Sequence, residues 1–223
     1  MATFVDDTFT DTDGTALDAH TGETGAAWTQ HPSYGVGTDS VINSNRLRDA
    51  DSSNALVYYA SGVPAGVEYD VQVTLRRVAG GGQDFSGFFG RLSTTVDSGY
   101  FLQYRVDVTE WRLFKADGGA YTQLGSYVQG LTNDTDYVAR LEVKDATKKL
   151  FVDGVERISS TNNDITAAGR AGMRLIGSAT ASDGSHWDNF SATDIGVTTT
   201  RGMPFGHHGT AFGGGRPLAG NIR

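Results

Sequence analysis

The sequence predicts an all-β domain, an antiparallel β-sandwich or jelly roll, followed by an extended C-terminal arm. Segments rich in Val, Thr, Tyr and Phe alternate apolar and polar residues, which is typical of half-buried strands. Turn residues recur about every ten positions, as they do in sandwiches and barrels. No helical period extends beyond about two turns, and proline is scarce, with 4 in 223 residues. We place the domain at residues 1–195 and the arm at 196–223.

The strands are expected at short intervals after a less regular opening. Residues 10–55 predict long loops with a few short strands, near Trp28 and within 41–47 and 55–59. The Asp153-Gly154 pair predicts a tight hairpin turn. Longer strands are expected at 69–78, 85–93, 100–108, 111–115, 121–129, 135–144, 148–158, 169–177 and 186–193.

Alternation assigns a face to each side chain of the longer strands, because successive residues of a strand point to opposite sides. In 69–78, Val71, Val73 and Leu75 share one face. Two further strands give the sets Leu102, Tyr104, Val106 and Val108, and Tyr137, Ala139, Leu141 and Val143. We expect these apolar faces to meet in a common core.

Three short segments resemble a known family. They are DDTF at 6–9, followed by WT at 28–29; KLFVDGV at 149–155; and HWDNFSAT at 186–193. In order, they are similar to the first strand, the Asp-Gly hairpin and the closing strand of concanavalin A-like lectin/glucanase jelly rolls, including laminin-G-like modules. The resemblance spans residues 3–194 and implies that fold. The fold carries lectins, carbohydrate-binding modules, glycosidases, lyases and structural virion domains, so it does not decide the function.

Composition excludes several classes of partner and site. The chain has no cysteine, which rules out disulfides and thiolate metal sites. Its net charge is −8, and the arm contributes +3, which leaves −11 on the first 195 residues. Such an acidic body argues against nucleic-acid binding. No apolar stretch is long enough to span a membrane, and the first residues lack the pattern of a signal peptide.

The carboxylates do not form a recognisable catalytic pattern. The resemblance would imply, for a retaining glycosidase, two acids on one strand in the pattern Glu-x-Asp-x-x-Glu. Glu142 and Asp145 do not fit that spacing, and Glu110 stands alone. Gly-x-Ser-x-Gly and His-Glu-x-x-His motifs are also missing from the sequence. We therefore predict that the protein is not an enzyme and requires no cofactor.

The resemblance also implies a structural calcium ion beside the closing strand. Asp188 matches the position of the family's acidic ligand there. Asp6 or Asp7, or the turn at 11–14, would supply further oxygens, and we take Asp7 with Asp188 as the predicted ligands. The alternative is that Asp188 pairs locally or caps a turn. The sequence leaves both interpretations open.

One face of the strand at 100–108 is a candidate surface for glycans. Phe101, Gln103 and Arg105 alternate with the apolar residues of that strand, and Arg112 lies on the next one. Aromatic rings with polar groups between them are what a sugar-binding surface needs. The alternative is an ordinary solvated outer face, which antiparallel sheets commonly have.

The arm differs in composition from the rest of the chain. Residues 196–223 contain eight glycines, three arginines and no Asp or Glu. Glycine at this density opposes a helix, and spaced apolar residues are unusual in solvated linkers. We expect an extended segment that docks onto a partner, against the alternative of a disordered tail. The predicted docking residues are Arg201, Met203, Phe205, Phe212, Arg216, Leu218 and Ile222.

These observations lead to a functional hypothesis and two alternatives. The arm is similar to short C-terminal tails of bacteriophage structural proteins, which implies a virion protein: capsid decoration, cement, or a head or tail fibre component. Its partners would be other virion proteins and copies of itself, and it would be extracellular after host lysis. The outward jelly roll would bind host-surface glycans. The alternatives are a free-standing carbohydrate-binding module or lectin, and a polysaccharide hydrolase or lyase.

Overall fold

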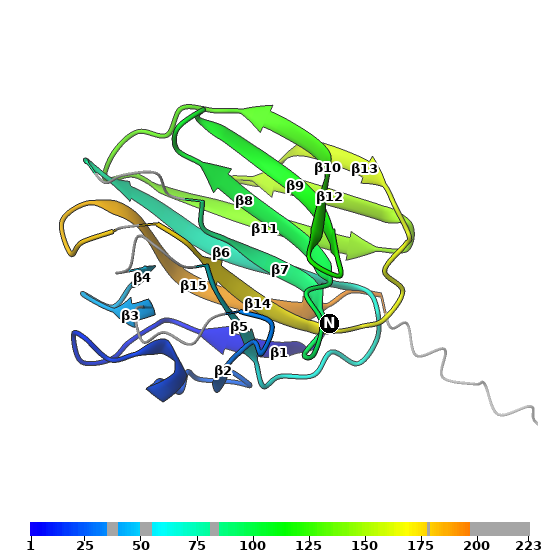
Figure 1. Ribbon diagram of the computed structural model, residues 1–223, viewed down its shortest axis with the longest axis horizontal. Coiled ribbons are helices and arrows are strands. Elements are labelled where there is room, and N and C mark those ends of the chain that lie inside the picture. The colour runs from blue at the N-terminus through cyan, green and yellow to red at the C-terminus, as the bar shows by residue number, and fades with distance from the viewer. Residues whose placement is uncertain (35–39, 50–54, 81–84, 178, 197–223) are drawn as a thin grey trace, which may run out of the picture.

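The protein, in a computed structural model, is a sandwich of two antiparallel sheets (Figure 1). The structure describes residues 1–34, 40–49, 55–80, 85–177 and 179–196. Within them, the helical element is one 3-10 turn, η1 (Leu17–Ala19). The strands are β1 (Thr3–Asp7), β2 (Trp28–Gln30), β3 (Ser40–Ile42), β4 (Leu47–Asp49), β5 (Leu56–Ala60), β6 (Tyr69–Val78), β7 (Gly87–Leu92), β8 (Gly99–Arg105), β9 (Glu110–Asp117), β10 (Ala120–Val128), β11 (Asp136–Lys144), β12 (Thr147–Val152), β13 (Val155–Thr161), β14 (Arg170–Leu175) and β15 (Gly184–Asp194).

Strands far apart in the sequence pair within each sheet. The eight-stranded sheet has the order β13-β12-β11-β6-β15-β4-β3, with β1 added on β15. The seven-stranded sheet has the order β10-β9-β8-β7-β14-β5-β2. Each sheet therefore contains hairpins of consecutive strands, such as β8 with β9, and pairs of strands far apart in the sequence, such as β7 with β14. This connectivity confirms the predicted all-β sandwich.

The predicted apolar faces meet between the sheets. Val71 lies opposite Leu141, and Val73 opposite Ala139, in the pairing of β6 with β11. Their side chains are fully buried, as is Trp111 of the facing sheet. Removing these apolar surfaces from water is the main force that holds the two sheets together. The alternation read from the sequence therefore assigned the core face of these strands correctly, except that Val106 and Val108 lie in a turn after β8 and Val108 is exposed.

The predicted Asp-Gly hairpin is also present, between β12 and β13. Asp153 and Gly154 have φ angles of 50° and 77°, the left-handed region that a two-residue turn of this kind needs. Asp153 Oδ1 also accepts a hydrogen bond from the backbone N–H of Val138 at 2.9 Å, so the turn is tied to β11.

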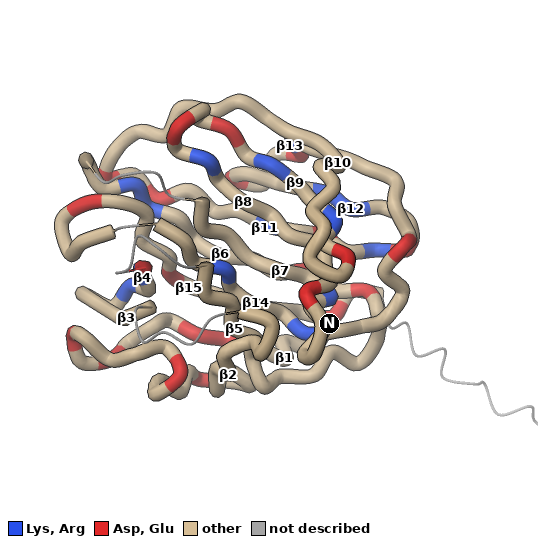
Figure 2. Tube along the Cα trace, in the orientation of Figure 1, with Lys and Arg blue, Asp and Glu red and all other residues tan. Residues whose placement is uncertain are grey.

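Charged residues of both signs are interspersed over the strands and turns (Figure 2). On the eight-stranded sheet, Arg76 pairs with Asp136 at 2.8 Å and Arg140 with Asp70 at 2.8 Å. The described part of the chain contains no helix long and apolar enough to cross a membrane.

Candidate functional site

The seven-stranded sheet carries a second apolar cluster on the side that faces away from the core. Its residues alternate along the strands with those of the core: in β8, Phe101 belongs to the outer cluster, whereas Tyr100 and Leu102 belong to the core. The buried members of the outer cluster are Val57, Phe89, Leu92, Phe101 and Ala116. Both sides of this sheet are therefore apolar, which is unusual for a sheet with one face toward water.

Partly exposed aromatic side chains cover this cluster. We call Tyr34, Tyr59, Phe114 and Tyr121 the aromatic face; Phe101 lies beneath it. The ring of Phe101 lies 6.2 Å from Phe114 in a stacked arrangement and 6.1 Å from Tyr121 edge-on. Offset stacked and edge-to-face contacts at these distances hold the rings in fixed orientations.

Two tyrosine hydroxyls and a carboxylate form a polar chain on the aromatic face. Tyr121 donates to Asp97 Oδ1 at 3.1 Å, and the hydroxyl oxygens of Tyr34 and Tyr121 are 2.6 Å apart. Burial raises the pKa of Tyr121 to about 12, and it raises that of Tyr34 as well. Both hydroxyls therefore keep their protons at neutral pH and can act as hydrogen-bond donors.

A guanidinium group lies among these rings. Arg174 Cζ is 5.2 Å from the ring centre of Phe101 and 5.5 Å from that of Tyr121. Cation–π contacts at such distances fix the guanidinium beside the aromatic rings. The face thus combines flat apolar surface with hydroxyl, carboxylate and guanidinium groups, the components of a site for polar ring-shaped ligands.

The residues proposed from the sequence lie on or beside the aromatic face in different roles. Phe101 is 1% exposed and Gln103 7%, so both lie beneath the surface. Gln103 donates to the carbonyl of Phe85 at 2.7 Å. Arg105 pairs with Asp107 at 3.0 Å, and Arg112 pairs with Glu110 at 2.6 Å. These four stay predictions for glycan contact; the exposed aromatic area belongs to their neighbours.

Sequence reasoning missed Tyr34, Tyr59, Phe114, Tyr121 and Arg174. Phe114 and Tyr121 fall in strands that were predicted, at positions that alternation could have assigned to the face of Phe101. In the structure, Phe101 of β8 lies directly opposite Phe114 of β9, so the two side chains are on the same face of the sheet. Tyr34 follows β2 in a loop, and its approach to Tyr121, 87 residues later, has no sequence signal.

The two residues proposed as calcium ligands each contact protein donors. Asp7 is fully buried and accepts from Trp28 Nε1 at 2.6 Å, His20 Nε2 at 2.9 Å and the backbone N–H of Phe9 at 2.7 Å. In this arrangement those donors occupy both oxygens, and the set does not fit a calcium ion.

Asp188 lies 3.5 Å from Arg46, a cation that disfavours a metal ion beside it. Within the described ranges, no group of three His, Cys, Asp or Glu residues is placed to hold a metal. Calcium at Asp7 and Asp188 stays a prediction that this geometry does not support.

The buried contacts of His20 give the fold a predicted pH dependence. Burial lowers the pKa of His20, but hydrogen bonds to Asp11 at 2.8 Å and to Asp7 outweigh it, so the pKa is raised. A raised pKa means that protonated His20 stabilises the fold below about pH 6.5, and this contribution is lost as the pH rises through the folded-state value. We expect the urea midpoint to fall between about pH 6 and pH 8 in the native chain.

The His20→Gln variant should show a smaller change over the same interval, whereas Asp18→Asn, an exposed change, should follow the native chain. Equal pH slopes for the native chain and His20→Gln would show that His20 is not the group responsible.

No protein-family model matches the chain, and no curated protein matches its sequence. The structure is similar to the carbohydrate binding module CBM66 from Bacillus subtilis, with a TM-score of 0.57 and 14% identity, covering 75% of this chain and 95% of that one. It is also similar to the exoplasmic/lumenal domain of VIP36 in its Ca²⁺/Man-bound form, with a TM-score of 0.56 and 12% identity, covering 78% and 85%. At such identities the similarity shows the fold alone, and the chain has the concanavalin A-like, lectin-like β-sandwich that its sequence motifs indicated.

Proposed function

We propose that the domain is a carbohydrate-binding module and that the aromatic face binds the glycan. The observation that carries the proposal is a second apolar cluster, outside the core, capped by partly exposed rings and joined to the Tyr34–Tyr121–Asp97 chain. Similarity to a carbohydrate binding module and to a mannose-bound domain supports it as an analogy of fold.

The chemistry of a sugar ring explains why such a surface suits it. One side of a pyranose presents C–H groups that pack against aromatic rings, and Phe114 and Tyr121 offer that surface. The ring edge presents hydroxyls, which can donate to the Tyr34 oxygen and to Asp97, because the Tyr34 proton is already donated to Tyr121 and that of Tyr121 to Asp97. Because both tyrosine hydroxyls and Arg174 are already held by neighbours, little side-chain freedom is lost on binding.

The virion hypothesis remains a second, untested proposal. It depends on the arm, and residues 197–223, with the predicted docking side chains Arg201, Phe205 and Phe212, lie outside the described residues. The two proposals are separable, since truncation after Ile195 should abolish docking onto a partner or onto other copies and leave glycan binding unchanged.

The glycan proposal predicts a specific loss of binding in Tyr121→Ala. Removing the ring deletes a stacking surface and the hydroxyl bonded to Asp97, so we expect affinity for the bound polysaccharide to fall by about tenfold or more. The measurement is isothermal titration calorimetry after a screen of soluble polysaccharides by affinity electrophoresis.

Tyr127→Ala is the matched control, because Tyr127 lies on the same strand but packs against the core cluster. It should bind as the native chain does. Failure of the native chain to bind any glycan, or equal binding by Tyr121→Ala, would refute the proposal.

A further inference from the structure

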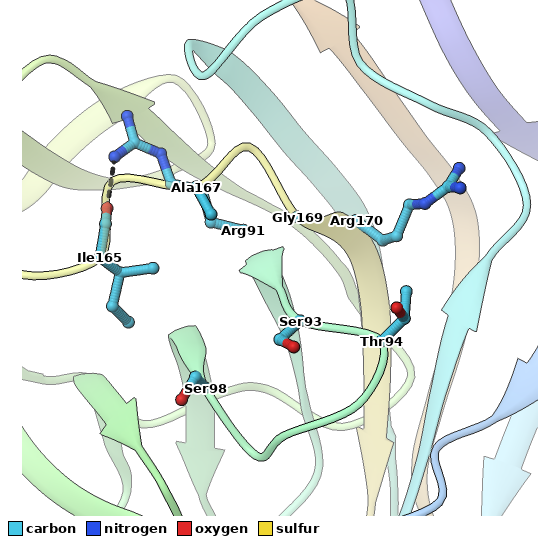
Figure 3. Close-up of a pocket in the computed structure, with 8 residues that line it drawn as sticks. All are labelled: Arg91, Ser93, Thr94, Ser98, Ile165, Ala167, Gly169 and Arg170. Atoms are coloured by element: carbon cyan, nitrogen blue, oxygen red, sulfur yellow. Dashed lines mark hydrogen bonds between the residues drawn. The ribbon is translucent and has the colours of Figure 1, made fainter.

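A separate cavity lies at one end of the sandwich, beside Arg91. It has a volume of about 330 Å³ and lies where the end of β7, the loop before β8 and the loop before β14 meet. Its walls include Arg91, Arg170, Ser93, Thr94, Ser98 and Ile165 (Figure 3). A volume of this size is at the low end of the range for small-molecule sites. We call it the Arg91 cavity.

The described residues that line the cavity include two arginines and no carboxylate. This is unexpected in a body that carries −11. Figure 3 shows Arg91 directed toward Ile165 and Arg170 on the other side of the view, with Ser93, Thr94 and Ser98 below them. Arg170 donates to the carbonyl of Ser61 at 2.6 Å, and in the described part of the chain it has no carboxylate partner. Its other N–H groups remain to bind a ligand.

Arg91 is a buried cation without a counter-charge in contact. It donates to the carbonyls of Val67 and Ile165, both at 2.8 Å, and it is 2% exposed. Its Nη2 has no hydrogen-bond partner among the described residues. A buried charge that is neither paired nor fully hydrogen-bonded is unfavourable, and a nearby anion would relieve it.

A second buried cation lies behind Arg91. Lys148 is fully buried, and its Nζ donates to the carbonyls of Asp145 at 2.8 Å and Asn162 at 2.9 Å. Lys148 Nζ and Arg91 Cζ lie over the same ring, that of Tyr100, at 4.6 Å and 5.9 Å. Burial and the charge of Arg91 lower the pKa of Lys148 to about 8, although Asp145 and Glu68 act in the opposite direction. Two buried cations, Lys148 and Arg91, therefore lie close together at this end of the sandwich.

The hydroxyl groups of the cavity wall are oriented to donate. Ser98 Oγ accepts from the backbone N–H of Gly118 at 3.1 Å, which leaves its proton for another acceptor. The Thr94 hydroxyl has no hydrogen-bond partner in the described ranges. Two O–H groups that can donate and the Arg170 guanidinium, all lining one cavity, favour oxyanions over neutral hydroxyls.

We propose that the Arg91 cavity binds the anionic group of an acidic monosaccharide, a carboxylate or a sulfate. Arg170, Thr94 and Ser98 are the direct donors, while Arg91 in the wall and Lys148, which lies over the same Tyr100 ring, act through their charge. The cavity shares none of its lining residues with the aromatic face, so the anion site is independent of that face, whereas the choice of a monosaccharide as the carrier of the anion rests on the proposed function.

The test is calorimetric titration of the full chain with glucuronate, glucose 6-sulfate and glucose. The two anions should bind, more weakly as salt rises, and glucose should bind at least about tenfold more weakly. The preferred anion tells whether a carboxylate or a sulfate is the ligand. Arg170→Gln, and separately the double variant Thr94→Val with Ser98→Ala, should each weaken anion binding by about tenfold.

Two controls make the outcome specific. Arg157→Gln removes a cation that lies over Tyr127, on β13, and should bind the anions unchanged. Tyr121→Ala should also bind them unchanged, which separates this site from the aromatic face. Thermal unfolding of each variant checks that the fold is intact. The proposal is overturned if neither anion binds, if glucose binds equally well, or if the Arg170 and hydroxyl variants bind as the native chain does.

Discussion

Replacing Asp7 by alanine is expected to lower the free energy of unfolding by about 3–5 kcal/mol. The carboxylate accepts three hydrogen bonds in the interior, from Trp28 Nε1, His20 Nε2 and the N–H of Phe9. Alanine leaves all three donors without that acceptor, in a place that water does not reach. His20 would keep only Asp11 as an acidic partner.

The effect should reach beyond one side chain, because Asp7 joins three parts of the fold. It ends β1, where it lies opposite Phe190 of β15, and Phe190 packs edge-on against Trp28 at 5.1 Å. The residues around η1, including His20, lie against the same carboxylate. Loss of Asp7 therefore loosens the N-terminal segment from both sheets.

Urea unfolding followed by tryptophan fluorescence measures this difference. Asp7→Asn keeps one oxygen and should lose less stability than Asp7→Ala, while Asp18→Ala, an exposed change near η1, should stay within about 0.5 kcal/mol of the native chain. If Asp7→Ala lost less than about 1 kcal/mol, the buried network would not have the role given to it here. If a chelator lowered the urea midpoint of the native chain as much as Asp7→Ala does, that result would instead favour the calcium prediction.

Alternation predicted most of the sandwich from the sequence. The strands at 69–78, 135–144 and 186–193 agree closely with β6, β11 and β15, because a two-residue period survives wherever one face is buried. Residues 106–108, expected to continue a strand, instead form the turn between β8 and β9. The order of strands in each sheet was not predictable, since pairs such as β7 with β14 are set by packing and not by local pattern.

The site was predicted less completely than the fold, and the reasons are physical. Alternation placed Phe101 and Gln103 on the correct side of β8, but burial of that side depends on a loop residue, Tyr34, from far along the chain. Likewise, Asp7 was predicted as a calcium ligand, and its hydrogen bonds to His20 and Trp28 could not be predicted because they are tertiary contacts. Pattern reveals which face a residue occupies; it does not reveal what covers that face.

Of the features described, the Arg91 cavity was the least predictable from the sequence. Arg91 has a φ angle of 55° at the end of β7, and its guanidinium bonds the carbonyls of two separate loops. Lys148 reads as an ordinary polar residue of a hairpin, yet it is fully buried beside Tyr100. Neither composition nor periodicity indicates that a hydrophilic side chain is buried. The proximity of Arg91 and Lys148 at this end of the sandwich could therefore not be predicted from the sequence.

Gly87→Ala is expected to destabilise the domain by about 3 kcal/mol or more, the upper range for overpacking. A Cβ at Gly87 would lie 2.0 Å from the carbonyl oxygen of Leu102, a backbone atom of the paired strand. A flexible side chain could move aside, but this oxygen can move only if β7 and β8 separate. Because β7 also pairs with β14 on its other edge, the strand cannot shift as a whole without disturbing both neighbours.

The same substitution should also impair glycan binding, because β7 and β8 carry Phe89 and Phe101, whose rings are 4.7 Å apart beneath the aromatic face. Opening the two strands displaces the support of Tyr121 without altering Tyr121 itself. Gly130→Ala is the control, since a Cβ there meets no atom within 4 Å, and it should change stability by less than about 1 kcal/mol. Urea unfolding gives the stability difference, and calorimetry at low temperature, where Gly87→Ala is still folded, gives the binding difference. Native-like stability in Gly87→Ala would mean that β7 and β8 are further apart than the structure places them, and the register that builds the aromatic face would then have to be revised.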